Sequence, residues 1–455
     1  MDKIKGLVVT GLSGGSGKSI VSVGLTAALS RSGAKVLPFK KGPDYIDAGW
    51  LQKASTEKCY NLDPYFVENE LLKKLFATRA QGAEYIVVEG SRGLYDGVNV
   101  DGGYSTAELA ITLGLPVVLV VNCTKTTRTI AALVLGCKLF DERVNIAGVI
   151  LNQIATKRQK KLISKAVEKY TGIPVVGAIP RTKREVFPMR HLGMLPHQEY
   201  EGSDEAVEYL AELVSENVDL EKIENIMSTP SWVATIDQEM VQPIPQTLKI
   251  GVIRDAAFQF YYFENLEALE QGGAELIFLD AMSDEGLPEL DGLYIGGGFP
   301  ETGAARLAAN KPFMESIREN VEKALPVYAE CGGLIYLGSS IEVKKERYDL
   351  VSVFPTHFGM SKKPQAHGYS IFKVDQENPF YEVGTVIKGH EFRYSTVQEF
   401  DGTSEDLKLQ MERGTGFMDG RDGLCYKNVL AMYTHVHADG APLWVEGFLK
   451  KCADW

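Results

Sequence analysis

Short apolar runs alternate with longer stretches of helical period through the first half of the chain. An amphipathic stretch from Lys18 to Arg31 separates the first two runs, and comparable stretches separate the others. The runs are residues 6–10, 35–39, 85–90, 115–121 and 146–152. Apolar strands joined by helical crossovers are typical of a mainly parallel, doubly wound sheet, so the pattern predicts an α/β fold.

The pattern lapses between about residues 218 and 247, where the sequence is polar, contains three prolines and keeps no period. It resumes at Leu248, and strands are expected before a GGG turn at 296–298 and before Cys331. We therefore predict two doubly wound, mainly parallel α/β domains, residues 1–230 and 248–455, joined by a linker at 231–247.

Composition narrows the class of protein. The 455 residues are 45% hydrophobic and 24% charged, and the apolar runs are too short to cross a membrane. A formal charge of −12 argues against a broad nucleic-acid-binding face. The six cysteines form no CxxC pair, which fits a reducing compartment. The first residues lack the pattern of a signal peptide, so we expect a cytoplasmic protein that binds small molecules.

The turn after the first apolar run has the features of a phosphate-binding loop. It reads GLSGGSGKS from Gly11 to Ser19, and it follows a strand and opens a helix. The standard spacing would place glycine at Leu12, whereas here it lies one residue earlier. Backbone amides and a helix N-terminus would bind phosphates, Lys18 would reach the β- and γ-phosphates, and Ser19 would ligate magnesium. The predicted nucleotide contacts are Gly14, Gly15, Gly17, Lys18, Ser19 and, more weakly, Asn152, which could contact adenine.

Three carboxylates strengthen a nucleotide assignment. Asp44 and Asp47 follow the second strand, and Glu89 ends the strand YIVVE. Ligands of open α/β sheets gather at the carboxyl ends of strands. We expect Ser19 and Glu89 to hold magnesium bound to ATP.

A second chemical signal lies around Cys331. The segment AECGG follows a strand and precedes a helical run, which is the arrangement of a nucleophile elbow. A helix N-terminus favours the thiolate form of cysteine. Backbone amides at Gly297, Gly298 and Gly332 would form an oxyanion hole, and the late His435 would be the general base.

These motifs occur in the order seen in cobyrinic acid a,c-diamide synthases, which the sequence resembles over nearly its whole length. The shared segments are GPDYID, VVEGSRGLYDG, GGGFPE, AECGG, GHEFRYS and YTHVH. The resemblance implies a P-loop NTPase-like ATP domain of the dethiobiotin synthetase type, followed by a class I, triad-type glutamine amidotransferase domain. It implies ATP- and glutamine-dependent amidation of the a and c acetates of a tetrapyrrole through an acyl phosphate. The displaced glycine of the phosphate loop also matches that family.

The resemblance also assigns residue roles. Cys331 attacks glutamine with His435 as base, and His437 stands where classical class I enzymes have glutamate, so the third triad member stays open. Asp44, Asp47 and Glu89 would serve magnesium, ATP and acyl-phosphate chemistry. Lys40, Tyr45, Ile46 and Asp96 would lie toward the acyl phosphate or the tetrapyrrole.

Alternatives differ mainly in the substrate. Arg393 replaces a histidine usual in the family, and residues 413–428 are closer to relatives acting on sirohydrochlorin or siroheme, so a siroheme or nickel-sirohydrochlorin amidase is one alternative. CTP synthase would end its triad with His-x-Glu, and cobyric acid synthase typically lacks GPDYID. A non-enzymatic P-loop switch is a further class, against which Cys331 and His435 argue. The ring, its metal, the number of amides and a homo-oligomeric state stay open.

Overall fold

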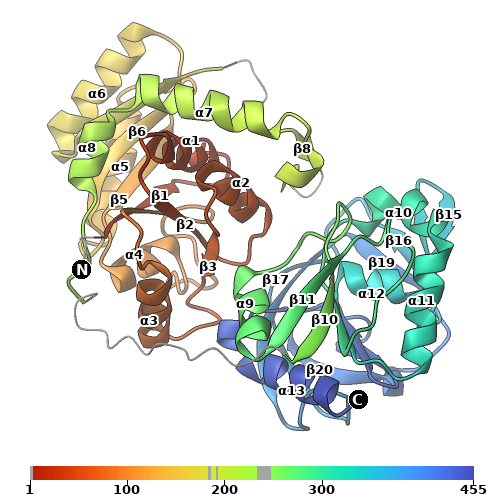
Figure 1. Ribbon diagram of the computed structural model, residues 1–455. Coiled ribbons are helices and arrows are strands. Elements are labelled where there is room, and N and C mark those ends of the chain that lie inside the picture. The colour runs from red at the N-terminus through yellow and green to blue at the C-terminus, as the bar shows by residue number, and fades with distance from the viewer. Residues whose placement is uncertain (1–3, 183–185, 191–192, 233–246) are drawn as a thin grey trace. The chain divides into compact units, whose positions relative to one another are not determined.

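The computed structural model describes residues 4–182, 186–190, 193–232 and 247–455. The chain divides into two compact units, Met1–Glu239 and Met240–Trp455, and each is built on a sheet of its own (Figure 1). Most of the predicted linker, residues 233–246, lies outside the described residues.

The first unit has a seven-stranded sheet in the order β3-β2-β4-β1-β5-β6-β7, and every neighbouring pair is parallel. A parallel order of this kind needs a crossover between strands, which the helices supply. The strands are β1 (Lys5–Gly11), β2 (Val36–Lys41), β3 (Tyr60–Leu62), β4 (Tyr85–Glu89), β5 (Val117–Asn122), β6 (Ile146–Ile154) and β7 (Val175–Pro180), with a separate pair β8 (Met189–Arg190) and β9 (Gly193–Met194).

Helices cover both faces of this sheet (Figure 1). One face packs against α1, α2, α7 and α8 in a core that includes Leu7 and Val9 of the central strand. Helices α1 and α7 approach closely, since a Cβ at Gly24 would lie 2.5 Å from Val214 Cγ2. The helices are α1 (Lys18–Arg31), α2 (Ile46–Ser55), α3 (Asn69–Arg79), α4 (Thr106–Leu113), α5 (Thr129–Phe140), α6 (Lys157–Thr171), α7 (Ser203–Asn217) and α8 (Leu220–Ile226).

Helix α8 corrects one expectation from the sequence, because it lies in the stretch after residue 218 that keeps no sustained period. The Asp219 side chain caps it by accepting the Lys222 N–H at 3.1 Å. Ile223 is fully buried and belongs to the core. One buried side chain and a cap are enough for a two-turn helix, but they are too little to produce a periodic signal.

The second unit has a ten-stranded sheet in the order β11-β10-β12-β13-β22-β21-β20-β17-β18-β23. The pairings from β11 to β22 are parallel, and those from β22 to β23 are antiparallel. The α/β class is confirmed, and the antiparallel extension is an addition that the sequence pattern did not reveal. The sheet strands are β10 (Leu248–Ile253), β11 (Ala274–Leu279), β12 (Gly292–Ile295), β13 (Val327–Glu330), β17 (Ala366–Val374), β18 (Val386–Arg393), β20 (Leu407–Arg413), β21 (Arg421–Tyr426), β22 (Val429–Met432) and β23 (His435–Val436).

A four-stranded sheet, in the order β15-β14-β16-β19, completes the second unit. Its strands are β14 (Ser340–Val343), β15 (Glu346–Asp349), β16 (Thr356–Met360) and β19 (Ser395–Phe400). The helices of the unit are α9 (Phe263–Gln271), α10 (Pro300–Ala309), α11 (Lys311–Glu322), α12 (Gly332–Leu337) and α13 (Pro442–Ala453).

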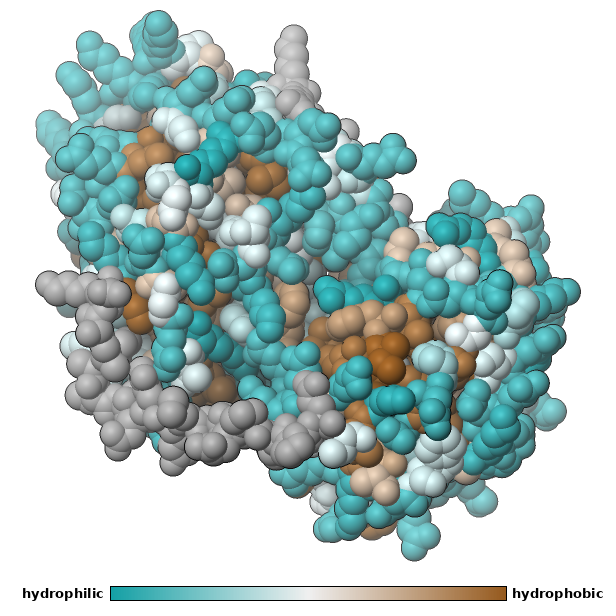
Figure 2. All heavy atoms as spheres, in the orientation of Figure 1, coloured by the Kyte–Doolittle hydropathy of each residue, from teal (hydrophilic) through white to brown (hydrophobic). Residues whose placement is uncertain are grey.

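The visible surface of both units is mostly hydrophilic (Figure 2). The second unit carries a hydrophobic patch where Figure 1 shows β11, and Phe278 of that strand is 49% exposed. Within the described ranges, no helix is both long enough and apolar enough to cross a bilayer.

Candidate active sites

The loop Gly11–Ser19 joins β1 to α1 and is held in shape by its own contacts. Gly15 and Gly17 have φ of 74° and 98°, which favour glycine. The buried Ser16 hydroxyl donates to Ser13 O at 2.9 Å and accepts the Ser13 N–H at 3.1 Å. The turn therefore places backbone amides at the start of α1, where an anion is favoured.

The individual loop residues differ in exposure. Gly14 and Gly15 are exposed, so a phosphate could approach their amides directly. Lys18 is 8% exposed, and burial together with the nearby Lys40 lowers the pKa of its ammonium. The exposed amides and the buried ammonium of Lys18 both suit a polyphosphate. Its negative charge would balance the positive charge of Lys18.

Asn152, at the carboxyl end of β6, contacts the loop. Its Nδ2 donates to Ser16 O at 3.0 Å, and its Oδ1 accepts the Gln153 N–H at 2.9 Å. A Cβ at Gly17 would lie 2.0 Å from Asn152 Nδ2, so glycine is needed for this close approach. Both polar atoms of Asn152 support the loop here, and the adenine contact stays a prediction.

The ammonium group of Lys40 lies among the three predicted carboxylates. The buried lysine extends from β2, and its Nζ lies 2.6 Å from Asp47 Oδ2, 3.1 Å from Glu89 Oε1 and 3.8 Å from Asp44 Oδ2. The acidic residues come from α2, β4 and the loop before α2, so the fold brings them together at the carboxyl edge of the sheet, as the sequence predicts. This group, Lys40, Asp44, Asp47 and Glu89, is called the lysine–carboxylate cluster below.

Two serines of α1 fix the Glu89 carboxylate. Ser19 Oγ donates to Oε1 at 2.8 Å, and Ser22 Oγ donates to Oε2 at 2.7 Å. Ser22 was not predicted from the sequence, although it lies three residues after Ser19 and therefore on the same helix face. The side chains of Ser19, Asp44 and Glu89 carry oxygen donors, which is the type of ligand that Mg²⁺ prefers.

Burial and charge set the protonation of the cluster. Burial and the Asp47 carboxylate raise the pKa of Asp44 to about 7, against the opposing effect of Lys40. Burial alone would raise the pKa of Asp47, but contact with Lys40 holds it below its usual range. Burial raises the pKa of Glu89, and Lys40 opposes the shift. Lys40 itself remains protonated because the three carboxylates outweigh the effect of burial and raise its pKa.

The predicted substrate-side residues lie near this cluster in the chain but have different contacts. Tyr45 precedes α2, and its carbonyl accepts the Gly49 N–H at 2.9 Å. Ile46 is the first residue of α2 and packs on the core. Asp96 Oδ2 accepts the Gly93 N–H at 2.8 Å, so its side chain stabilises a turn. Contacts of these residues with a substrate stay predictions.

Cys331 forms a sharp turn between β13 and α12. Its φ of 47° and ψ of −94° are unusual for a residue with a side chain. The backbone N–H donates to Met432 O at 2.7 Å, which anchors the turn to β22. Gly333 allows the tight packing that follows, since a Cβ there would lie 2.5 Å from Ile295 O. This geometry is that of a nucleophile elbow.

The predicted oxyanion-hole glycines surround the same point. A Cβ at Gly332 would lie 2.9 Å from Gly298 N, and one at Gly297 would lie 2.4 Å from His435 Cε1. The glycine segment after β12, the start of α12 and the imidazole of His435 therefore meet closely. Backbone amides could approach a substrate oxygen there because these positions lack side chains.

His435 contacts the nucleophile and a carboxylate. Burial alone would lower the pKa of His435, but the Cys331 thiol and the Glu330 carboxylate raise it to about 10. His435 Nδ1 lies 3.5 Å from Glu330 Oε2. Glu330 was not predicted from the sequence, although a charged residue at the end of the apolar strand LPVYAE was a visible signal.

His437 faces other partners than those of His435. Its Nε2 lies 3.7 Å from Glu264 Oε1, and its Nδ1 lies 4.0 Å from Asp439 Oδ2. The ring is buried against Tyr262, with centroids 4.5 Å apart. A catalytic role for His437 stays a prediction, and these contacts do not favour it.

Arg393, the departure noted in the sequence, packs within the second unit. Its guanidinium lies 3.8 Å from the ring centroid of Tyr433 and donates to the Ser395 and Gly416 carbonyls at 2.7 Å each. This buried arginine therefore packs on a residue two positions before His435.

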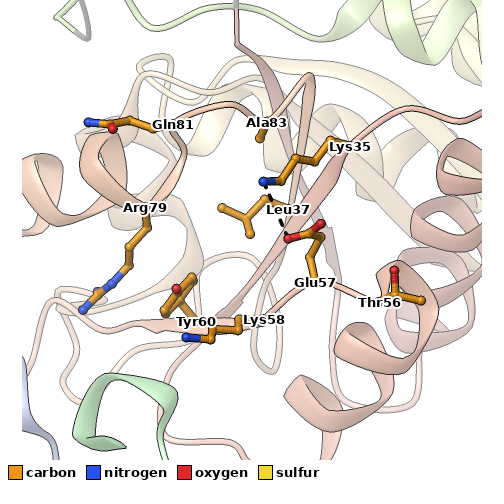
Figure 3. Close-up of a pocket in the computed structure, with 9 residues that line it drawn as sticks. All are labelled: Lys35, Leu37, Thr56, Glu57, Lys58, Tyr60, Arg79, Gln81 and Ala83. Carbon is orange, nitrogen blue, oxygen red and sulfur yellow. Dashed lines mark ion pairs between the residues drawn. The ribbon is translucent and has the colours of Figure 1, made fainter. Parts of the chain in front are cut away.

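A cavity of about 340 Å³ lies at the amino ends of β2 and β3 in the first sheet (Figure 3). Its lining includes Leu37 and Tyr60, at the starts of β2 and β3, and an ion pair of 3.8 Å between Lys35 and Glu57. The phosphate loop and the lysine–carboxylate cluster lie at the carboxyl ends of the strands, so this cavity is separate from them.

Comparison with known proteins gives matches over nearly the whole chain. Residues 7–190 match the model of the CobQ/CobB/MinD/ParA nucleotide binding domain, and residues 249–443 match that of the CobB/CobQ-like glutamine amidotransferase domain. The cobyrinate a,c-diamide synthase of Magnetococcus marinus is 39% identical over 97% of this chain and 96% of its own length. That of Archaeoglobus fulgidus is 38% identical over 98% and 97%. A solved glutamine amidotransferase aligns with 45% of this chain and 98% of its own, at 19% identity and a TM-score of 0.34.

Proposed function

The chain belongs to the cobyrinate a,c-diamide synthase family, and from this premise we propose that it converts the a and c acetates of a cobyrinate-type tetrapyrrole to amides. ATP would activate each carboxylate, and glutamine would supply the nitrogen. The observation that carries the proposal is the presence of two groups of chemically active residues in one chain: a phosphate loop beside the lysine–carboxylate cluster, and a cysteine elbow beside His435.

The first site is suited to phosphoryl transfer. A substrate carboxylate oxygen attacks the γ-phosphorus of ATP, ADP leaves, and an acyl phosphate forms. Lys18 and the loop amides compensate the charge of the phosphates. Ser19, Asp44 and Glu89 would hold Mg²⁺, which when bound neutralises phosphate charge. Lys40 and Asp47 would face the transferred group.

The second site is suited to glutamine hydrolysis. The Cys331 thiolate attacks the amide carbon of glutamine, and protonated His435 gives its proton to the departing ammonia. Water then cleaves the thioester, which releases glutamate and restores the thiol. Amides of Gly298 and Gly332 would stabilise the tetrahedral oxyanion. Ammonia displaces phosphate from the acyl phosphate and yields the amide.

Mass spectrometry of the products tests the proposal. The full-length protein would be incubated with ATP, Mg²⁺ and glutamine, and separately with cobyrinate, sirohydrochlorin or siroheme. Two successive mass losses of about 1 Da on cobyrinate, each from replacing OH by NH₂, are expected. The same change on sirohydrochlorin or siroheme alone would move the assignment to that ring. An absence of amide with every ring, together with an absence of glutaminase activity, would favour a nucleotide-dependent switch.

A further inference from the structure

Glu330 is a buried carboxylate that ends β13, next to the nucleophile. It is 1% exposed, and the three residues before it are Val327, Tyr328 and Ala329. A charged group in such a position is stable only when its oxygens have partners. Both of its oxygens have partners, one on β12 and one on β23.

The partners of Glu330 tie the catalytic histidine to the elbow. Oε1 accepts the Val436 N–H at 3.1 Å, next to His435 on β23. Oε2 accepts the Tyr294 hydroxyl at 3.3 Å and lies 3.5 Å from His435 Nδ1. One carboxylate therefore accepts a backbone N–H of β23 and lies beside the ring that this strand carries.

We propose that Glu330 is the positioning residue that completes a relay of Cys331, His435 and Glu330. The proposal rests on the glutamine hydrolysis proposed above. A carboxylate at Nδ1 keeps a proton on that nitrogen and leaves Nε2 to exchange a proton with the thiol. The third member of the relay is then supplied by the residue before the nucleophile and not by position 437.

The surroundings of His435 and His437 separate the two candidates. His435 is faced by Cys331 from the elbow, by Glu330 from β13 and by His390 from β18. His437 instead lies between the carboxylates of Glu264 and Asp439. Two imidazole–carboxylate pairs thus lie close together in the chain, and only the pair made by Glu330 includes the ring that contacts the thiol.

The Glu330→Gln substitution distinguishes a positioning role from a purely structural one. The side-chain oxygen can still accept the Val436 N–H, so the strands stay joined. The amide NH₂ would then face Nδ1, which makes Nδ1 an acceptor and moves the imidazole proton to Nε2, the wrong tautomer for a base. An analogous change in the serine protease triad lowers kcat by about 10⁴.

The test uses the full-length protein and three readouts. We expect E330Q to lower the kcat of glutaminase by about 10³-fold or more, with the glutamine KM within about threefold. Alkylation of Cys331 by iodoacetamide, followed by mass spectrometry of its peptide, should need a higher pH to reach its maximal rate. ATP-dependent amidation with ammonium salts should be retained, which shows that the chain is folded.

The matched control is Glu264→Gln, which changes the buried carboxylate facing His437. We expect E264Q to lower kcat by less than about tenfold. Wild-type kcat and an unchanged alkylation profile in E330Q would overturn the proposal, and so would a large loss in E264Q alone. Glu330→Asp replaces E330Q if the latter loses the ammonium reaction: the shorter carboxylate should lower kcat with KM unchanged, and wild-type kcat would refute the role. An inactive wild-type glutaminase would refute the proposed function itself.

Discussion

His390 of β18 lies face to face with His435 of β23, with ring centroids 4.8 Å apart and planes inclined by 19°. Burial lowers the pKa of His390, and the neighbouring His435 and His437 lower it further. His390 is therefore a neutral ring at neutral pH. A neutral ring can stack on a protonated imidazole without charge repulsion. The contact with the face of His435 restrains the orientation of that ring.

Removal of the His390 ring should disturb His435 more than replacement of His390 by another aromatic residue. We expect His390→Ala to lower stability by about 1–3 kcal/mol and to reduce glutaminase activity, because His435 loses its stacking partner. His390→Phe keeps an aromatic face and should retain more activity. Steady-state glutaminase kinetics and thermal unfolding of both variants give the comparison, and equal activities would show that stacking is unimportant.

The two proposed sites should be separable by substitution. Cys331→Ser should reduce glutamine-dependent amidation by about 10³-fold or more and leave amidation with ammonium chloride. Lys18→Ala should show the reverse loss: amidation fails with either nitrogen source, whereas glutaminase activity remains. Loss of every activity in a C331S protein with wild-type unfolding behaviour would contradict separate sites.

Binding of a magnesium nucleotide should depend on pH through Asp44. Because the pKa of Asp44 is raised to about 7, its carboxyl keeps a proton at pH values where an ordinary aspartate is ionised. Protonation removes a magnesium ligand, so affinity should rise as pH increases through about 7 and then level off. By the same linkage, the contribution of Asp44 to unfolding free energy is full at acid pH and is lost as pH rises through about 7.

Calorimetric titration with Mg²⁺ and a non-hydrolysable ATP analogue, from pH 5.5 to 8.5, measures this dependence. The phosphate of the nucleotide also titrates in this range, so the informative quantity is the difference between wild type and Asp44→Asn. A pH dependence that is identical in both proteins would exclude Asp44 as its source.

A methyl group at Gly297 should displace the catalytic base. The Cβ of an alanine there would lie 2.4 Å from His435 Cε1, so the ring must shift. We expect Gly297→Ala to lower glutaminase kcat by about 100-fold. The matched control is Gly136→Ala, on the exposed face of α5 with open space at the new Cβ. That variant should keep its activity and gain up to about 1 kcal/mol from helix propensity.

The parts of the molecule that were predictable from sequence are those whose signal is local. The phosphate loop and the cysteine turn are contiguous motifs between a strand and a helix, and the α/β class and the family are confirmed. The alternation of runs gave β1, β2, β4, β5 and β6 to within about two residues. The proposed roles of individual residues stay predictions.

Features that depend on distant contacts escaped the sequence. Glu330 meets His435 across 105 positions, and a lone glutamate in a strand is not a motif. Ser22 binds Glu89 only because α1 crosses the end of β4. Spacing alone places His437 in the triad, and only the fold reveals that its ring faces Glu264 and Asp439. The antiparallel part of the second sheet depends on pairings between segments far apart in the sequence, such as β18 with β23.

The unusual backbone of Cys331 has an evolutionary consequence. A non-glycine residue with such dihedral angles destabilises a protein by about 1–3 kcal/mol, whereas glycine tolerates them. A Cys331→Gly replacement would relax the turn and remove the sulfur in one step. In an ammonia-rich environment glutamine is dispensable as a nitrogen donor, so selection would not retain the thiol. Mutation to the more stable glycine variant would then be tolerated.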